Sequence, residues 1–213
     1  MLVLTTTACY MYCLHCFRKR LVGYTSDEIS KRMDQTMDYL TAHHEINNIL
    51  LTGGDFFTLS NSQIEDYLVN LSQVEHLDFI RFGTRVPVVY PMRISDDLEF
   101  LDILEKFNQK KQLSVVTQFN HPKEITAEST KAVKELLNRG IPVNNQTVLL
   151  KGVNDDPDTL ADLMNKLTSI GVAPYYVFQC RPVSRVKNQF QLSLSDSYDI
   201  VESAKSKLNG HGK

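Results

Sequence analysis

The sequence predicts an α/β fold in which six parallel strands, each followed by a helix, form an open barrel. Short, nearly continuous apolar runs alternate six times with longer segments whose apolar residues recur every three or four positions. Such runs are typical of parallel strands covered on both faces. Six β-α units in a row imply one sheet with right-handed crossovers, and they are too few for a closed eight-stranded barrel. The expected architecture is therefore a partial, TIM-like (β/α)6 barrel.

The predicted strands follow the apolar runs along the chain. The first centres on Leu2-Val3-Leu4, the second on Ile49-Leu50-Leu51, and the last on Tyr175-Tyr176-Val177-Phe178. Each run is short and bounded by polar or turn-forming residues, which favours a strand over a buried helix. The six predicted ranges are 2–7, 46–51, 77–83, 113–118, 144–150 and 173–179.

Capping and stop residues place a helix after each strand. Side chains with a short oxygen arm favour helix starts, proline favours the first helical position, and glycine favours the end. Gly140 and Gly171 are the expected ends of the fourth and fifth helices. The expected starts are Thr25 or Ser26, Ser62, Ser95, Thr126, Pro157 and Ser195.

Length and composition limit the classes of function. At 213 residues and 24.3 kDa, residues 1–213 are expected to form a single domain with a sizeable core. A net charge of −2 gives no indication of binding to nucleic acid or to an anionic membrane. No apolar stretch approaches the ~20 residues of a membrane span. Three clustered cysteines of four favour a reducing compartment, so a cytoplasmic protein is expected. Both ends of the sequence look truncated.

Three cysteines lie within the first sixteen residues, at Cys9, Cys13 and Cys16. A four-iron cube held by three thiolates keeps one iron free to bind another molecule. A structural zinc site normally has four protein ligands, and only His15 and the distant Cys180 could complete one here. The C-x3-C-x2-C spacing favours an iron–sulfur cluster with an open iron. A zinc site and unligated core cysteines remain as alternatives.

Other polar groups lie at the carboxyl ends of the predicted strands, where parallel α/β folds bind ligands, and Gln146 lies on the fifth strand itself. The glycine pair could be a plain turn or could let a ligand approach the backbone, where Asp55 would accept from an ammonium group. The basic run after the first strand could be solvated or could grip a carboxylate. In chain order the groups are Arg18-Lys19-Arg20, Gly53-Gly54-Asp55, Gly83-Thr84-Arg85, Gln118, Gln146 and Arg181.

The cysteine spacing and the Gly-Gly-acidic turn together resemble the radical S-adenosylmethionine (SAM) enzymes, and within them the lysine 2,3-aminomutase family. The resemblance implies the open (β/α)6 barrel of that superfamily, and its segments span nearly the whole chain. These segments are Cys13-Leu-His-Cys-Phe-Arg-Lys-Arg20, Leu50-Leu-Thr-Gly-Gly-Asp55, Arg81-Phe-Gly-Thr-Arg-Val-Pro-Val-Val89, Gln118-Phe-Asn-His-Pro-Lys-Glu-Ile-Thr126, Asn145-Gln-Thr-Val-Leu-Leu-Lys-Gly-Val-Asn-Asp155 and Pro174-Tyr-Tyr-Val-Phe-Gln-Cys180.

The resemblance implies a set of roles for this chain. The cluster reduces SAM to give a 5′-deoxyadenosyl radical, which abstracts hydrogen from an amino-acid-like substrate. In full-length family members, pyridoxal phosphate (PLP) binds the substrate amine and allows 2,3-amino migration. An electron donor such as flavodoxin or ferredoxin and a homo-oligomer are also implied. The roles are [4Fe–4S] ligation by Cys9, Cys13 and Cys16, SAM contact by Gly53, Gly54, Asp55, Gln118 and Gln146, and substrate-carboxylate binding by Arg18.

Two positions depart from the family pattern. Arg181 stands where lysine aminomutases have an aspartate for the substrate ammonium, so an anionic substrate is expected in place of lysine. No residue is identifiable as the PLP lysine, because Lys213 comes directly after the last helix, without the expected strand. A PLP-independent radical SAM enzyme acting on an anionic substrate is therefore an alternative. So is a non-catalytic electron carrier or zinc-stabilised module.

Overall fold

A computed structural model describes residues 1–23 and 32–210 of the chain, and its strands form one open parallel sheet. The strand order β1-β2-β3-β4-β5-β6 follows the sequence. This confirms the predicted partial barrel, and each strand end lies within two residues of its predicted position. The strands are β1 Leu2–Thr6, β2 Asn48–Gly53, β3 Phe79–Gly83, β4 Gln112–Thr117, β5 Val143–Leu149 and β6 Ala173–Gln179.

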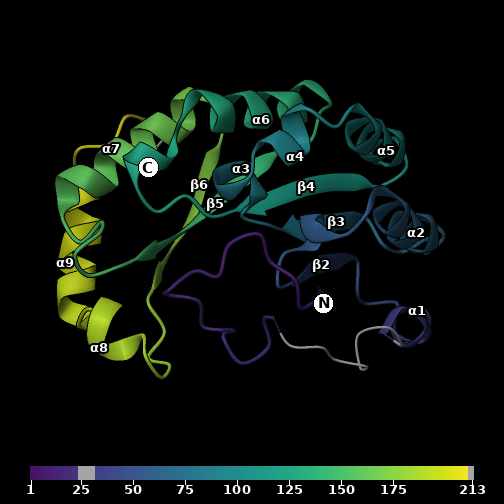
Figure 1. Ribbon diagram of the computed structural model, residues 1–213, viewed down its shortest axis with the longest axis horizontal. Coiled ribbons are helices and arrows are strands. Elements are labelled where there is room, and N and C mark those ends of the chain that lie inside the picture. The colour runs from purple at the N-terminus through teal and green to yellow at the C-terminus, as the bar shows by residue number, and fades with distance from the viewer. Residues whose placement is uncertain (24–31, 211–213) are drawn as a thin grey trace.

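Helices cover the convex side of the curved sheet, and the segment that follows β1 runs across the concave side (Figure 1). This arrangement leaves the concave side available for a site. The helices are α1 Arg32–Ala42, α2 Asn61–Ser72, α3 Val86–Val89, α4 Met92–Ser95, α5 Leu98–Asn108, α6 Ala127–Asn138, α7 Pro157–Ser169, α8 Lys187–Phe190 and α9 Leu194–Lys205. Of these, α3, α4 and α8 were not predicted. None of the described helices is both long and apolar enough to cross a bilayer.

Three helices begin at a polar residue two positions from the predicted one. The observed caps are Ser60, Asp97 and Ser193, in place of Ser62, Ser95 and Ser195. In α2 the Ser60 hydroxyl accepts the N–H of Gln63, and the Gln63 side chain accepts the N–H of Ser60. This reciprocal capping box fixes the start of the helix. The predicted starts at Thr126 and Pro157 are confirmed, whereas Thr25 and Ser26 lie outside the described residues.

A cluster of aromatic rings in the main core fixes the carboxyl ends of β2 and β3. Phe56 stacks on Phe82 with ring centroids 5.3 Å apart, and Phe57 meets Phe100 edge-on at 4.9 Å. All four side chains are fully buried. Such contacts add specific geometry to the burial of large apolar area. They therefore hold rigidly the turn that follows Gly53-Gly54-Asp55.

The inner face of the sheet is more polar than the core. Along β5, fully buried residues alternate with half-buried ones, because successive side chains point to opposite faces of a strand. The half-buried set includes Gln146, which pairs in register with Tyr176 of β6. On β3 the half-buried Arg81 donates from Nε to Asn48 Oδ1 at 2.8 Å. The concave side of the sheet thus offers hydrogen-bonding groups to a bound molecule.

Candidate active site

The three clustered cysteines lie on the segment between β1 and α1, and its described part, residues 7–23, is called the cysteine loop below. All three are free thiols and half-buried. The N–H of Cys16 donates to the carbonyl of Cys13 at 3.0 Å, which closes a tight turn between these two cysteines. Figure 1 shows the loop, in purple, inside the arc formed by the sheet and helices. The sequence pattern therefore maps to a single loop at the open mouth of the barrel.

The glycine pair at the end of β2 allows the start of the cysteine loop to pack closely. Gly54 N donates to Thr6 O at 2.6 Å, and Asp55 N donates to Ala8 O at 2.8 Å. A Cβ on Gly54 would lie 2.0 Å from Ala8 O, and Gly53 has a φ of 144°, which favours glycine. These glycines therefore have a structural role in seating the loop. Their predicted contact with SAM remains a prediction.

Asp55 connects the ends of β2 and β3. Its Oδ1 accepts from the Phe57 N–H at 3.1 Å and from the Thr84 hydroxyl at 2.6 Å, while Oδ2 accepts from the Arg85 N–H at 2.7 Å. The residue is buried. Burial raises the pKa of Asp55 to about 6, and the hydrogen bonds from Thr84, Arg85 and Phe57 oppose the rise. The role predicted for Asp55, contact with the amino end of SAM, is not tested by this geometry.

Arg85 reaches the cysteine loop directly, and no role was predicted for it. Its Nη1 donates to Cys13 Sγ at 2.9 Å, its Nε donates to Gln118 O at 3.1 Å, and its Nη2 meets Glu124 Oε1 at 2.5 Å. One guanidinium thereby joins the segments that follow β1, β3 and β4. The basic residue after the third strand was a visible signal, but its partners are distant in the sequence.

Two predicted SAM-contacting glutamines come to adjacent positions on the inner face. Thr117 of β4 pairs with Asn145 of β5, and Gln118 and Gln146 follow them. Gln118 Nε2 lies 3.0 Å from His15 Nε2 on the cysteine loop. Burial, with the charges of Arg85 and Lys19, lowers the pKa of His15 to about 4, so the ring is neutral at pH 7. A neutral ring can accept the amide hydrogen of Gln118 through Nε2.

Arg18 and Arg181 lie against the same aromatic ring. Their guanidinium carbons are 5.4 and 5.5 Å, respectively, from the ring centroid of Phe17. Arg18 also donates from Nη1 to Thr52 Oγ1 at 2.9 Å, and its buried Nε has no hydrogen-bond partner. Buried donors are normally satisfied, so this Nε indicates a site that is completed by an acceptor. The structure thus brings together two predicted substrate-binding residues from opposite edges of the sheet.

The thiols suit an iron–sulfur cluster that takes one sulfur per iron. Burial, with the nearby Asp55, raises the pKa of the Cys9 thiol to about 12, so metal binding must displace its proton. Cys13 already accepts from a cation, Arg85. Within residues 1–23 and 32–210, no three His, Cys, Asp or Glu side chains could hold a single metal ion. The role of the three thiols as cluster ligands remains a prediction.

Neither candidate for a fourth protein ligand is free to join the three cysteines. His15 Nε2 is engaged with Gln118. Cys180 is only 1% exposed and packs in a small apolar cluster with Leu150 and Val186. Cys180 is therefore a small buried apolar residue of this cluster. Three protein ligands are what the open-iron interpretation expects, and this ligand set remains a prediction.

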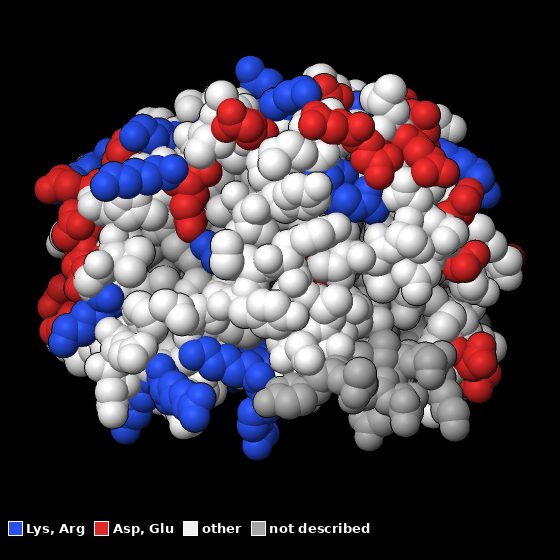
Figure 2. Space-filling model, viewed as in Figure 1, with Lys and Arg blue, Asp and Glu red and all other residues white. Residues whose placement is uncertain are grey.

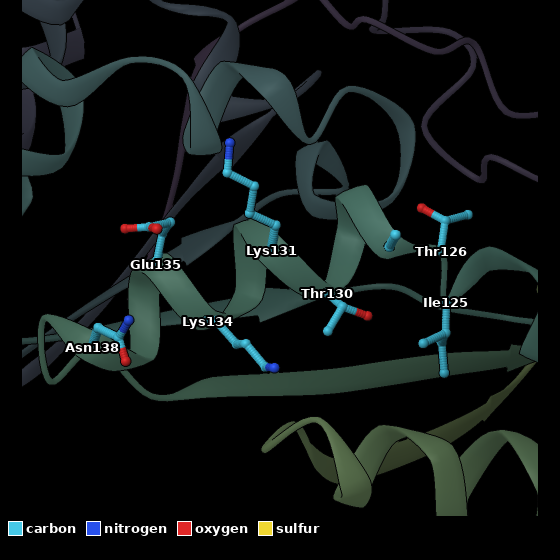
Figure 3. Close-up of a pocket in the computed structure, with 8 residues that line it drawn as sticks. Ile125, Thr126, Thr130, Lys131, Lys134, Glu135 and Asn138 are labelled. Atoms are coloured by element: carbon cyan, nitrogen blue, oxygen red, sulfur yellow. The ribbon is translucent and has the colours of Figure 1, made fainter.

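A surface groove of about 540 Å³ lies elsewhere, on the outer helix layer (Figure 3). Its lining comes from α6 and the two residues that precede the helix: Ile125, Thr126, Ala127, Thr130, Lys131, Lys134, Glu135 and Asn138. None of the predicted site residues lines it. We therefore place the candidate site at the cysteine loop.

The sequence comparisons identify one family. Residues 3–164 match the family model for the radical SAM superfamily. L-lysine 2,3-aminomutase from Clostridium subterminale is 37% identical over 211 residues, covering 99% of this chain and 49% of that protein. Glutamate 2,3-aminomutase from Clostridioides difficile (strain 630) is 40% identical over 203 residues, covering 95% of this chain and 47% of that one. The chain thus spans about half the length of the curated relatives it matches.

A solved structure supports the fold. The structure described as native anSMEcpe with bound AdoMet and Cp18Cys peptide matches with a TM-score of 0.68 at 13% identity, over 96% of this chain and 58% of that one. The residues matched by the family model, 3–164, include the cysteine loop of this chain. The chain therefore belongs to the radical SAM superfamily, and along nearly its whole length it resembles the lysine 2,3-aminomutases.

Proposed function

We propose that the protein abstracts a hydrogen atom from an amino acid whose side chain carries a negative charge, and that it moves the amino group between C2 and C3 when PLP is bound. Membership of the family implies a [4Fe–4S] cluster and SAM. When bound, they supply the electron and the adenosyl group that together remove the hydrogen atom. The protein residues hold, orient and shield the reacting molecules.

The roles assigned to the residues follow the sequence resemblance. Cys9, Cys13 and Cys16 would hold the cluster, and the inner-face Gln118 and Gln146 would contact SAM. The backbone after β2, at Gly53-Gly54-Asp55, would receive the amino end of SAM. We also propose a cytoplasmic protein that receives its electron from a flavodoxin- or ferredoxin-like donor and assembles as a homo-oligomer.

The single observation that carries the proposed substrate class is the pair of arginines on Phe17. The guanidinium groups of Arg18 and Arg181 both contact the Phe17 ring. The Nε of Arg18 is also buried without a hydrogen-bond partner. Among the described residues, no carboxylate pairs with either guanidinium. Arginine favours bidentate binding of carboxylates, so the two side chains suit a substrate with two carboxylates.

The charge of the surface supports the same substrate class. Figure 2 shows Lys and Arg side chains at the lower left and lower middle of the molecule, where Figure 1 places α8 and part of the cysteine loop, and others at the upper edge among acidic side chains. Asp and Glu gather mainly at the upper and outer edges of that view. A basic entrance would attract an anionic substrate and would repel lysine.

The test is anaerobic reconstitution with iron and sulfide, followed by electron paramagnetic resonance of the dithionite-reduced protein with and without SAM. We expect a reduced [4Fe–4S] signal that changes on SAM addition, with 5′-deoxyadenosine released. A cluster indifferent to SAM would contradict the proposal. Borohydride treatment after incubation with PLP would report an imine and so separate the aminomutase from a PLP-independent enzyme.

Substrate class is tested with glutamate and lysine at equal concentration. We expect 5′-deoxyadenosine formation to be stimulated by glutamate at least tenfold more than by lysine. Arg181→Asp should reduce this ratio by ~10-fold or more, because an anion replaces the cation that we propose attracts the substrate; a tenfold change corresponds to ~1.4 kcal/mol. Lys187→Asp, at the start of the nearby α8, is the control for net charge. Equal stimulation of the native protein by both amino acids would exclude this substrate class.

A further inference from the structure

We propose that Arg85 is a positioning residue for the iron–sulfur site: its guanidinium donates a hydrogen bond to the Cys13 sulfur and raises the reduction potential of the cluster. This inference rests on the proposed role of Cys13 as a cluster ligand. It does not depend on the substrate or on the use of PLP. No bond is made or broken in this role, since the cluster takes its electron from the external donor in every case.

Each nitrogen of the Arg85 guanidinium has a hydrogen-bond partner. Nη1 lies 2.9 Å from Cys13 Sγ, Nε lies 3.1 Å from Gln118 O, and Nη2 lies 2.5 Å from Glu124 Oε1. The backbone N–H of Arg85 donates to the buried Asp55 at 2.7 Å. Its three nitrogens therefore have three different partners, and only one orientation of the planar group satisfies them all.

The partner carboxylate is itself fixed. Glu124 Oε2 accepts from the Asn120 N–H at 2.6 Å and from the His121 N–H at 3.3 Å. The Arg85 and Glu124 side chains are only 17% and 24% exposed. Because Glu124 offsets most of the positive charge of Arg85, the local effect on Cys13 comes chiefly from the directed N–H group. A lysine at this position would supply charge without this planar fork.

Hydrogen bonds to cluster sulfurs are a principal determinant of iron–sulfur reduction potentials. Reduction places more negative charge on the sulfurs, so a donated N–H stabilises the reduced cluster more than the oxidised one. Loss of the Arg85 donor should therefore make the cluster harder to reduce. A merely structural arginine would change the stability of the protein without changing this equilibrium.

Arg93 provides a matched control. It also bridges several segments, since Nη1 pairs with Asp97 at 2.7 Å, Nη2 donates to Asn61 at 2.7 Å, and Nε donates to the Phe57 carbonyl at 3.3 Å. Its side chain is 9% exposed, even less than that of Arg85. No cysteine is among its hydrogen-bond partners in the described part of the chain. Arg93→Gln therefore removes a comparable bridge while leaving the sulfur contact in place.

The experiment is a redox titration of the reconstituted native protein, Arg85→Gln, Arg85→Lys and Arg93→Gln, without substrate, followed by the reduced-cluster resonance signal. At a fixed solution potential we expect about a tenfold lower ratio of reduced to oxidised cluster in Arg85→Gln, which corresponds to ~59 mV for a one-electron couple. Arg85→Lys should fall between Arg85→Gln and the native protein. Arg93→Gln should match the native potential. An unchanged potential in Arg85→Gln, or an equal shift in Arg93→Gln, would overturn the proposal.

Iron content and the thermal midpoint of each apo-protein complete the test. If both Arg85 variants fail to hold a cluster but keep the native midpoint, Arg85 acts in assembly of the site, and the proposal that it tunes the reduction potential is overturned. If they lose the cluster because they unfold, while Arg93→Gln loads normally, Arg85 is structural and the proposal fails. A native protein that holds a reducible cluster but never cleaves SAM would contradict the proposed function alone.

Discussion

At the scale of single residues, Gly54 shows how little room separates the cysteine loop from the end of β2. A Cβ at this position would lie 2.0 Å from Ala8 O. We expect Gly54→Ala to displace the start of the loop, to destabilise the protein by about 2–4 kcal/mol and to reduce iron incorporation. Urea unfolding and iron content after reconstitution measure both effects. Gly210→Ala is the control, because no atom lies within 4 Å of a Cβ there.

The Asn145 side chain forms hydrogen bonds with the backbone of Phe119, in place of the backbone pairing of two strands. Its Oδ1 accepts from Phe119 N at 2.6 Å, and its Nδ2 donates to Phe119 O at 3.1 Å, in a fully buried setting. Asn145→Ala leaves both backbone groups without this partner. We expect a loss of about 2–4 kcal/mol in urea unfolding. Asn138→Ala, at an exposed position on α6, should change stability by less than about 0.5 kcal/mol. Similar losses in both variants would contradict this account.

The residues of the candidate site were partly predictable from the sequence. The cysteine cluster and the glycine pair can be recognised in the sequence itself, because each consists of residues that are close together along the chain. The contact between Arg85 and Cys13 joins residues 72 positions apart, and nothing local marks it. Whether Gly54 seats a loop or admits a ligand also depends on what packs against it. Contacts of this kind are set by the fold and not by spacing.

At the scale of elements, the cap of α7 gives a pH-dependent prediction. Hydrogen bonds from Thr159 and from backbone N–H groups of the first turn lower the pKa of Asp156 below its usual 3.8. This contribution is present above pH 3.8 and is lost as the pH falls through the lower folded-state value. We expect Asp156→Ala to cost about 1 kcal/mol at pH 7, and the cost should shrink toward pH 3.

The control for the cap is Asp162→Ala, which removes an exposed i,i+4 pair with Lys166. Its expected cost is about 0.3–0.5 kcal/mol or less. Chemical denaturation of both variants at several pH values compares them. A cost for Asp156→Ala that is the same at pH 7 and pH 3 would show that the carboxylate is not the capping group.

Element type was more predictable than element boundaries. The strands were found because six short apolar runs alternate with helical patterns, and tertiary packing agreed with that pattern. The caps of α2, α5 and α9 were misplaced because several polar residues lie close together, and only the fold selects among them. The four-residue helices α3, α4 and α8 are too short to show helical periodicity.

At the scale of the whole molecule, stability should be uneven across the sheet. The inner strands have a partner on each side, whereas β6 has one partner and is largely exposed or half-buried. Local opening is favoured where few apolar contacts and few protected hydrogen bonds exist. We therefore expect amide hydrogen exchange at least ~100-fold slower in β3 and β4 than in β6. Mass spectrometry of the corresponding peptides measures this, and equal rates in the three strands would contradict it.

The attachments of the cysteine loop have a consequence for how the protein is made. The loop leaves the ribosome before its partners are made, because His15 contacts Gln118, which lies 103 positions later, and Phe17 contacts Arg181. At a synthesis rate of about 5–20 residues per second, the cysteine loop lacks these contacts for roughly ten seconds or more. During that interval the thiols are open to oxygen and to stray metal ions. Delivery of iron and sulfur is therefore best timed after β6 and Arg181 have emerged from the ribosome.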